Sequence, residues 1–200
     1  MRRVTVIVLL SIAVAAAADK DKTRFAPGPA SSYPSHQTLD QITIAAAPFI
    51  TDAETGAAFD KLNPNKYGVL PVLVILENGT GKALRLNLKA EFVTADGKHI
   101  DATPAEDVQT LGALKKPPKI GAPPPLPIPL PGRNKKGPLN VWEIDGLAFS
   151  AKLLPVGERV YGFFYFQTEH EPGSRIYLTG IKDAASGQDY FYYELPLNKQ

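Results

Sequence analysis

The feature that most constrains the fold is a ten-residue run, 84–93, in which apolar and polar side chains alternate. Successive side chains of a β-strand point to opposite faces, so the run predicts a strand with one face in a core and the other in solvent. Just before it, the almost continuous apolar run 69–76 predicts a central strand that is buried on both faces. The chain is therefore expected to be mainly β.

Two short helices are expected in the connections. Thr51 and Glu54 have the spacing of a capping box, which predicts a helix that ends near Leu62. A second helix is expected to start at Thr103–Glu106, with Pro104 at its first helical position, and to end near Gly112.

Seven or eight strands at short spacing, with only two short helices, predict a single antiparallel β-sandwich. A doubly wound parallel sheet is disfavoured because the helices are too few and too short to cover it. The other expected strands are 41–44, 98–101, 147–153, 159–167, 175–181 and 188–195.

The N-terminus predicts export. Residues 1–18 have a basic start, a short apolar run and a small-residue end before Asp19, which is typical of a signal peptide. The expected location is the periplasm or the extracellular space. The alternative is a membrane tether formed by an uncleaved segment, but the apolar run 4–18 is shorter than the roughly 20 residues that span a bilayer. No stable membrane span is expected after cleavage.

The mature chain is expected to hold a flexible linker at 19–38 and one domain at 39–197, interrupted by a Pro-rich basic loop at 113–140. The chain has no Cys, which excludes disulfides, thiolate metal sites and Cys nucleophiles. Without residues 1–18 the formal charge is zero, because 20 basic residues face 20 acidic ones. No nucleic-acid partner is expected at that charge.

The Pro-rich loop contains no acid, and its stretch 117–131 alone holds eight of the 19 prolines. Its charge of +6 leaves −6 on the rest of the mature chain. One interpretation is a solvated insertion whose lysines only keep it soluble. Another is a docking segment for an unknown protein or envelope component, because polyproline chains fit aromatic grooves. A third is that the loop folds back on its own domain. Its candidate contact residues are Lys115, Lys116, Lys119, Pro123, Pro124, Pro125, Leu126, Pro127, Pro129, Arg133, Lys135 and Lys136.

Ten of the 18 aromatic residues lie between Tyr161 and Tyr193. A period of two in 190–193 puts Tyr190 and Tyr192 on one face and Phe191 on the other. These aromatics are expected either to fill the core or to form an exposed tyrosine surface, in which Tyr190 and Tyr192 are candidate interaction residues.

Two further segments carry a resemblance to a known class of domain. The run 69–80 with Asn78 at its turn precedes the alternating strand, and the turn 154–158 precedes the Gly–Phe-rich strand 162–166. This pattern resembles bacterial exported immunoglobulin-like domains of unknown function. The resemblance implies an immunoglobulin-like fold and an exported setting, and it transfers no catalytic residue. The Cys–Trp–Cys core of antibody-type domains is absent.

No nucleophile, cofactor or metal motif is found in the sequence. Glu169, His170 and Glu171 can ligate metals, but contiguous side chains point apart in an extended chain, so no metal site or cofactor is expected. Asn78-Gly79-Thr80 is formally a glycosylation sequon, although a turn is its plainer role. We therefore expect a non-enzymatic protein that acts by surface binding. The alternatives are a secreted hydrolase that uses surface carboxylates and a purely structural accessory module.

Overall fold

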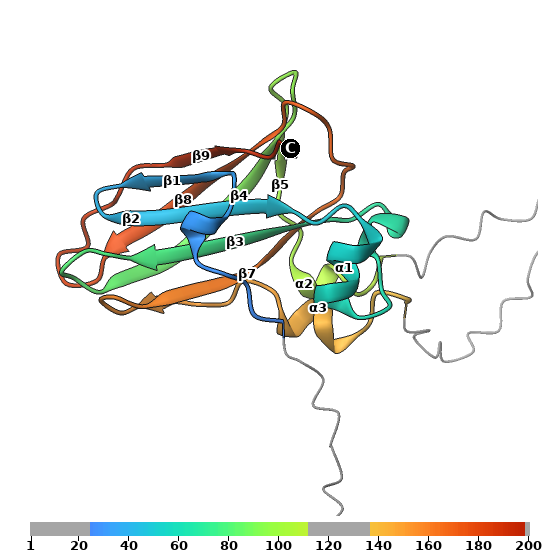
Figure 1. Ribbon diagram of the computed structural model, residues 1–200, viewed down its shortest axis with the longest axis horizontal. Helices are drawn as coiled ribbons and strands as arrows, with labels where there is room; N and C mark the ends of the chain where they lie inside the picture. The colour runs from blue at the N-terminus through green and yellow to red at the C-terminus, as the bar shows by residue number, and fades with distance from the viewer. Residues whose placement is uncertain (1–24, 112–136, 199–200) are drawn as a thin grey trace, which may run out of the picture.

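The computed structural model describes residues 25–111 and 137–198, which form nine strands, three short α-helices and two 3-10 turns (Figure 1). The predicted signal peptide and the Pro-rich loop up to Lys136 lie outside the described residues. The elements are η1 Ala30–Ser32, β1 His36–Leu39, β2 Ile42–Pro48, α1 Asp52–Phe59, η2 Pro64–Tyr67, β3 Leu70–Asn78, β4 Leu84–Val93, β5 His99–Asp101, α2 Ala105–Val108, α3 Trp142–Gly146, β6 Leu153–Leu154, β7 Arg159–Phe166, β8 Arg175–Asp183 and β9 Tyr193–Pro196.

The strands form two antiparallel sheets, so the expectation of a mainly β fold is confirmed. One sheet has the order β1-β2-β3-β7, and the other has the order β5-β4-β8-β9 with β6 paired to β4. Nine strands are found where seven or eight were expected. The two sheets share one apolar core, which includes Val72 and Val74 of β3, Leu86 and Phe92 of β4, and Leu178 of β8.

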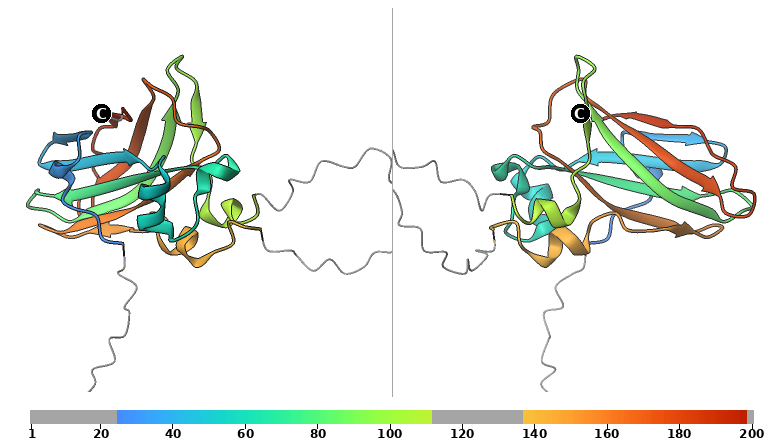
Figure 2. Two further views of the ribbon diagram at one scale, coloured as in Figure 1. Left: turned by 45° about the vertical axis from the view of Figure 1, so that its right-hand side comes forward. Right: turned by 180° about the vertical axis from the view of Figure 1, so that it is seen from behind.

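A second core covers the other face of the β1-β2-β3-β7 sheet. Leu73 of β3 and Phe163 of β7 pack there with Phe59 of α1 and Ile144 of α3. The three helices gather at one end of the sheets, as Figures 1 and 2 show. Strand β3 lies between the two cores and is buried on both faces, as its apolar run predicts.

The predicted capping box starts α1. The Thr51 hydroxyl accepts from the Glu54 backbone N–H, and the Glu54 carboxylate accepts from the Thr51 N–H. The helix ends at Phe59 rather than near Leu62, because Asp60 takes a positive φ of 58° that helical residues do not adopt.

Pro71 lies inside β3, where its missing N–H needs a substitute. The Phe49 N–H donates to the Pro71 carbonyl, so these two residues face each other across the strands. A residue other than proline would return a bond to the Phe49 carbonyl. That carbonyl instead accepts from the Asn65 side-chain amide at 2.8 Å. Asn65 therefore satisfies the position that proline leaves open.

The structure differs from the prediction of a flexible linker at 19–38. Within it, the Phe25 side chain packs on the second core, Ala30 is fully buried, and β1 pairs with β2. The β1–β2 turn uses Asp40 and Gln41 at φ values of 49° and 65°. A two-residue hairpin normally marks such positions with glycine or Asn-Gly, so this turn carried no signal in the sequence.

The predicted strand 147–153 is replaced by a crossing between the sheets. The Phe149 N–H donates to the Phe163 carbonyl of β7, whereas the Leu86 N–H of β4 donates to the Lys152 carbonyl. Only β6 at its end is a strand. The segment alternates like a strand because it pairs first with the edge of one sheet and then with the edge of the other.

The start of the second predicted helix also differs from the prediction. Pro104 takes the N-cap position of α2 instead of its first helical position, and no side chain caps the helix. Thr103 was expected to cap it, but its N–H donates to the Tyr165 carbonyl at 2.7 Å and its hydroxyl accepts from Gln167. Helix α3 was not anticipated. Just before it, Leu139, at the end of the Pro-rich loop, is fully buried.

Candidate functional site

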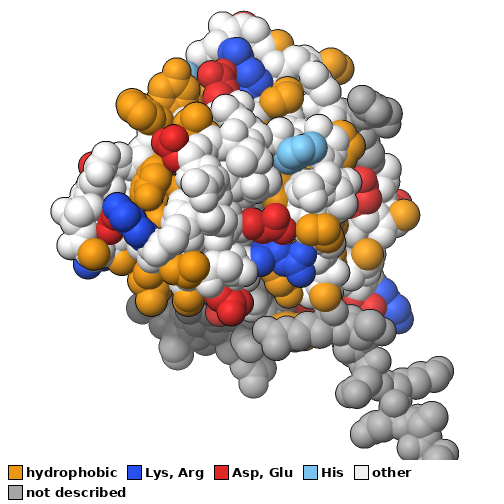
Figure 3. Space-filling view, turned by 60° about the vertical axis from the view of Figure 1, so that its left-hand side comes forward, with side chains coloured by type: hydrophobic (Ala, Val, Ile, Leu, Met, Phe, Trp, Pro, Cys, Tyr) orange, Lys and Arg blue, Asp and Glu red, His pale blue; other side chains and the backbone are white. Residues whose placement is uncertain are grey.

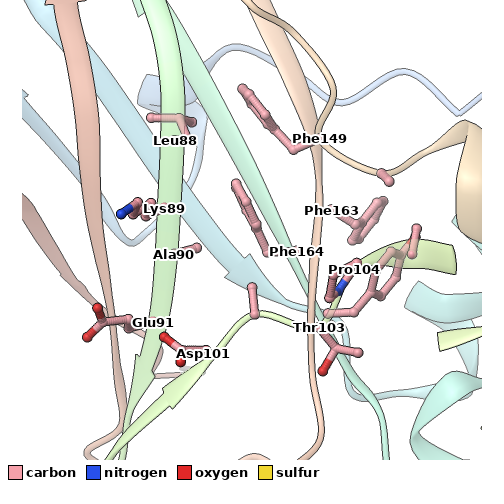
Figure 4. A pocket seen from close by; sticks show the side chains of 14 residues that line it. Leu88, Lys89, Ala90, Glu91, Asp101, Thr103, Pro104, Phe149, Phe163 and Phe164 are labelled. Carbon is pink, nitrogen blue, oxygen red and sulfur yellow. The ribbon is translucent and has the colours of Figure 1, made fainter. Parts of the chain in front are cut away.

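One hollow among the described residues lies between the edges of strands β4 and β7. On its outer side, β4 pairs with β6 only at Leu84 and Arg85 and with β5 only at 91–93. Within the described chain, no strand pairs with the stretch between them on that side. Strand β7 is the edge of the opposite sheet. The space between the sheets therefore opens to solvent here, in a cleft of about 330 Å³ (Figure 4).

We call this hollow the edge cleft. Its apolar wall is formed by half-buried Leu88 and buried Ala90 on β4, together with Phe164 on β7 and Phe149 before β6. The rings of Phe149 and Phe164 stack with centroids 5.3 Å apart and planes 12° apart. Both rings are half-buried, so this stacked pair presents aromatic surface to the cleft.

Gly162 on β7 sets the position of Phe149. A Cβ atom at residue 162 would lie 2.4 Å from the Phe149 Cα atom, which is closer than non-bonded atoms approach. Only glycine therefore lets the backbone before β6 lie against β7. The Phe163 N–H completes the attachment by donating to the Leu147 carbonyl at 2.8 Å.

The rim of the edge cleft is polar and mixed in charge. Lys89, Glu91, Asp101 and Thr103 line it. Glu91 of β4 lies directly opposite Asp101 of β5, so the two carboxylates are neighbours across the strands. The Glu91 carboxylate also meets the His99 Nδ1 atom at 2.5 Å. An apolar floor with stacked rings and carboxylates at the rim can hold an extended apolar chain that carries a cation.

The predicted interaction residues of the Pro-rich loop, Lys115 to Lys136, lie outside the described residues. The two predicted tyrosines do not form one surface. Tyr190 packs against the core shared by the sheets, whereas Tyr192 is 54% exposed and its ring lies 5.0 Å from the Tyr177 ring. Residues 190–192 precede β9 and are not in a strand, so the period of two does not apply to them.

The aromatic side chains of strand β7 alternate between its two faces, and both faces are used for packing. Phe163 and Tyr165 enter the core under the helices, and Phe166 enters the core between the sheets. The Tyr165 hydroxyl donates to the Ile144 carbonyl at 2.7 Å, and burial raises its pKa above the ordinary range. Burial also raises the pKa of Tyr193 to about 12, with a smaller contribution from Asp40.

The other candidate residues have structural roles. Glu171 accepts from the Ala95 N–H, and His170 Nε2 lies 2.6 Å from the Leu197 carbonyl. No group of three or more metal-ligating side chains converges anywhere in 25–111 or 137–198. Asn78 of the sequon is 2% exposed, and its amide nitrogen donates to three carbonyls, including that of Leu154. Its role in the turn is therefore confirmed.

No protein-family model matches this chain, and a search of curated proteins finds no match. Helices long and apolar enough to cross a membrane are absent from the part of the chain that the structure describes.

Sequence reasoning missed the edge cleft and its stacked pair. In the sequence, Phe149 looks like one residue of the alternating strand 147–153, and Leu88 looks like a core position of the alternating strand 84–93. The one available signal was Gly162 inside an otherwise bulky strand. An isolated glycine in a strand indicates that another backbone approaches closely.

Proposed function

We propose that the protein is an exported, non-enzymatic binding module of the immunoglobulin-like class, with its ligand site in the edge cleft. The basic and apolar N-terminus supports export. The observation that carries the binding role is the open Phe149–Phe164 stack, because the neighbouring aromatic residues of β7 are closed off by packing.

The strand order supports the immunoglobulin-like assignment. In such domains the second strand lies between the first and the fifth, and the sixth lies between the third and the seventh. Here β3 lies between β2 and β7, and β8 lies between β4 and β9. The correspondence leaves β1, β5 and β6 as additions at the edges of the two sheets.

An extended polypeptide rich in proline or other apolar residues fits the edge cleft best. Aromatic grooves bind such chains because they are already extended and lose little entropy on binding. A volume of about 330 Å³ accommodates a few side chains rather than a folded domain. The partner is then a protein or envelope component with an accessible extended segment.

The test is photocrosslinking from inside the edge cleft in the organism that exports the protein. A photoreactive amino acid replaces Leu88, and a matched variant carries it at Leu153, an apolar residue that is 54% exposed on β6. We expect a crosslinked product from position 88 that is absent from position 153, and its loss when Phe164→Ala is added. Equal products from both positions would contradict a ligand site in the edge cleft.

A further inference from the structure

We propose that the edge cleft binds the chain's own Pro-rich loop, through the part 113–136 that lies outside the described residues. This inference rests on the proposed function and names its ligand class, a cationic proline-rich chain. The loop is then a tethered ligand that an external partner of the same chemistry has to displace.

The ends of the described chain make the contact geometrically accessible. The description stops at Leu111 and resumes at Gly137. Pro104 and Ala105, which line the edge cleft, precede Leu111 by only a few residues, and Ala148 and Phe149 follow Gly137 by about ten. The 25 residues between span about 78 Å when extended at about 3.1 Å per residue. The loop can therefore reach the edge cleft from both of its ends.

The charge around the two attachment points complements the loop. Residues 113–136 carry six basic side chains and no acid. The described stretches on either side, 101–111 and 137–151, carry five acids and no Lys or Arg. Three of these acids, Glu106, Asp107 and Asp145, are exposed on α2 and α3, and Asp101 lies at the cleft rim. Opposite charges at this spacing favour contact of the loop with this side of the domain.

Two other parts of the described surface lack this one-sided charge. On the face shown in Figure 3, acidic and basic side chains are interspersed. Around the exposed Tyr192, two acids already have basic partners: Arg175 pairs with Glu194 at 3.0 Å, and Lys182 pairs with Asp189 at 3.1 Å. The tyrosine surface therefore offers aromatic rings beside ion-paired acids, whereas the edge cleft lies next to the exposed acids of α2 and α3.

The chemistry of the floor matches the central run of the loop. Residues 123–131 alternate proline with leucine and isoleucine after three consecutive prolines. Proline rings and aliphatic side chains pack on aromatic faces, and the Phe149–Phe164 stack is the aromatic surface that the edge cleft offers. The flanking lysines then lie within reach of Asp101 and of the helix acids.

Disulfide trapping tests the inference, since the chain contains no Cys of its own. One variant combines Leu88→Cys in the edge cleft with Pro125→Cys in the loop, and its matched control combines Leu153→Cys with Pro125→Cys. A tethered chain of this length meets any nearby surface at millimolar effective concentration, so the control reports random encounters. Docking is expected to make the 88–125 disulfide form at least about tenfold faster, in the monomer.

Equal rates for the two pairs would overturn the inference, and so would 88–125 disulfides found only between two molecules. In a third variant, serine replaces the other prolines of 123–131, and the excess rate at position 88 should disappear. Circular dichroism shows that each variant is folded before its rate is counted.

The two proposals fail separately. Photocrosslinking from position 88 is repeated with residues 113–136 replaced by a Gly/Ser linker of equal length. If the loop is a tethered ligand, capture of the external partner rises. If trapping fails but capture persists, the loop docking is wrong and the ligand site stands. If capture is absent with and without the loop, the proposed function is wrong.

Discussion

Phe163 and Phe164 are adjacent on β7 but point to opposite faces, which gives a matched pair of substitutions. Phe163 is 1% exposed, and its ring centroid lies 4.8 to 5.6 Å from those of Phe25, Phe49 and Phe59. Phe164 is half-buried and stacks on Phe149 beside an open cleft. Truncating the first residue should leave a closed cavity, whereas truncating the second should enlarge a space that water already reaches.

The expected losses follow from burial. Phe163→Ala should lower the free energy of unfolding by about 3–5 kcal/mol, the usual range for a buried phenylalanine. Phe164→Ala loses roughly half of a 1.5–3 kcal/mol transfer contribution and one aromatic pair worth about 0.5–1.5 kcal/mol, which gives about 2 kcal/mol. Urea unfolding followed by far-UV circular dichroism measures both values. Equal losses would refute the argument, because they would show that Phe164 is a core residue and that the edge cleft is closed.

Three further changes test separate parts of the structure. Asn78→Ala leaves buried carbonyls without their donor and should cost about 2–4 kcal/mol in urea unfolding, whereas exposed Asn87→Ala should cost less than about 0.5 kcal/mol. The Lys82 ammonium and two backbone N–H groups hold the pKa of the Asp183 carboxyl well below its usual range. Its contribution to the free energy of unfolding is therefore complete above about pH 4 and is lost as the pH falls further. Asp183→Asn should flatten that part of a curve of stability against pH. Gly162→Ala should displace the backbone at residue 149 and cost at least about 2 kcal/mol by the same urea assay, whereas Gly56→Ala in helix α1, where an added Cβ meets nothing, should stabilise by about 0.5–1 kcal/mol.

Secondary structure was predicted correctly where the sequence pattern came from residues within a single element. The alternation at 84–93, the apolar run of β3 and the capping box at Thr51 each depend on neighbours in sequence, and each is present. The prediction was wrong where contacts between elements distant in sequence determine the structure. The alternation around Phe149 comes from pairing with two sheets in turn, and Thr103 bonds to β7 instead of capping α2.

The edge cleft could not be predicted for the same reason. Its walls come from β4, the start of α2, the segment before β6, and β7, which meet only in the folded chain. Composition did indicate which segment to consider as a ligand, because charge and proline content single out the Pro-rich loop without any structure. The acids that complement it on α2 and α3 are visible in the sequence, but their common placement beside the edge cleft is not.

Binding of a proline-rich cationic chain in the edge cleft is tested most directly by titration. The protein with residues 113–136 replaced by a Gly/Ser linker is mixed with a synthetic peptide of that sequence and followed by NMR. The account predicts saturable shifts at Leu88, Phe149 and Phe164, and their loss in the Phe164→Ala variant. Shifts confined to Tyr177 and Tyr192, or no shifts at millimolar peptide concentration, would contradict it.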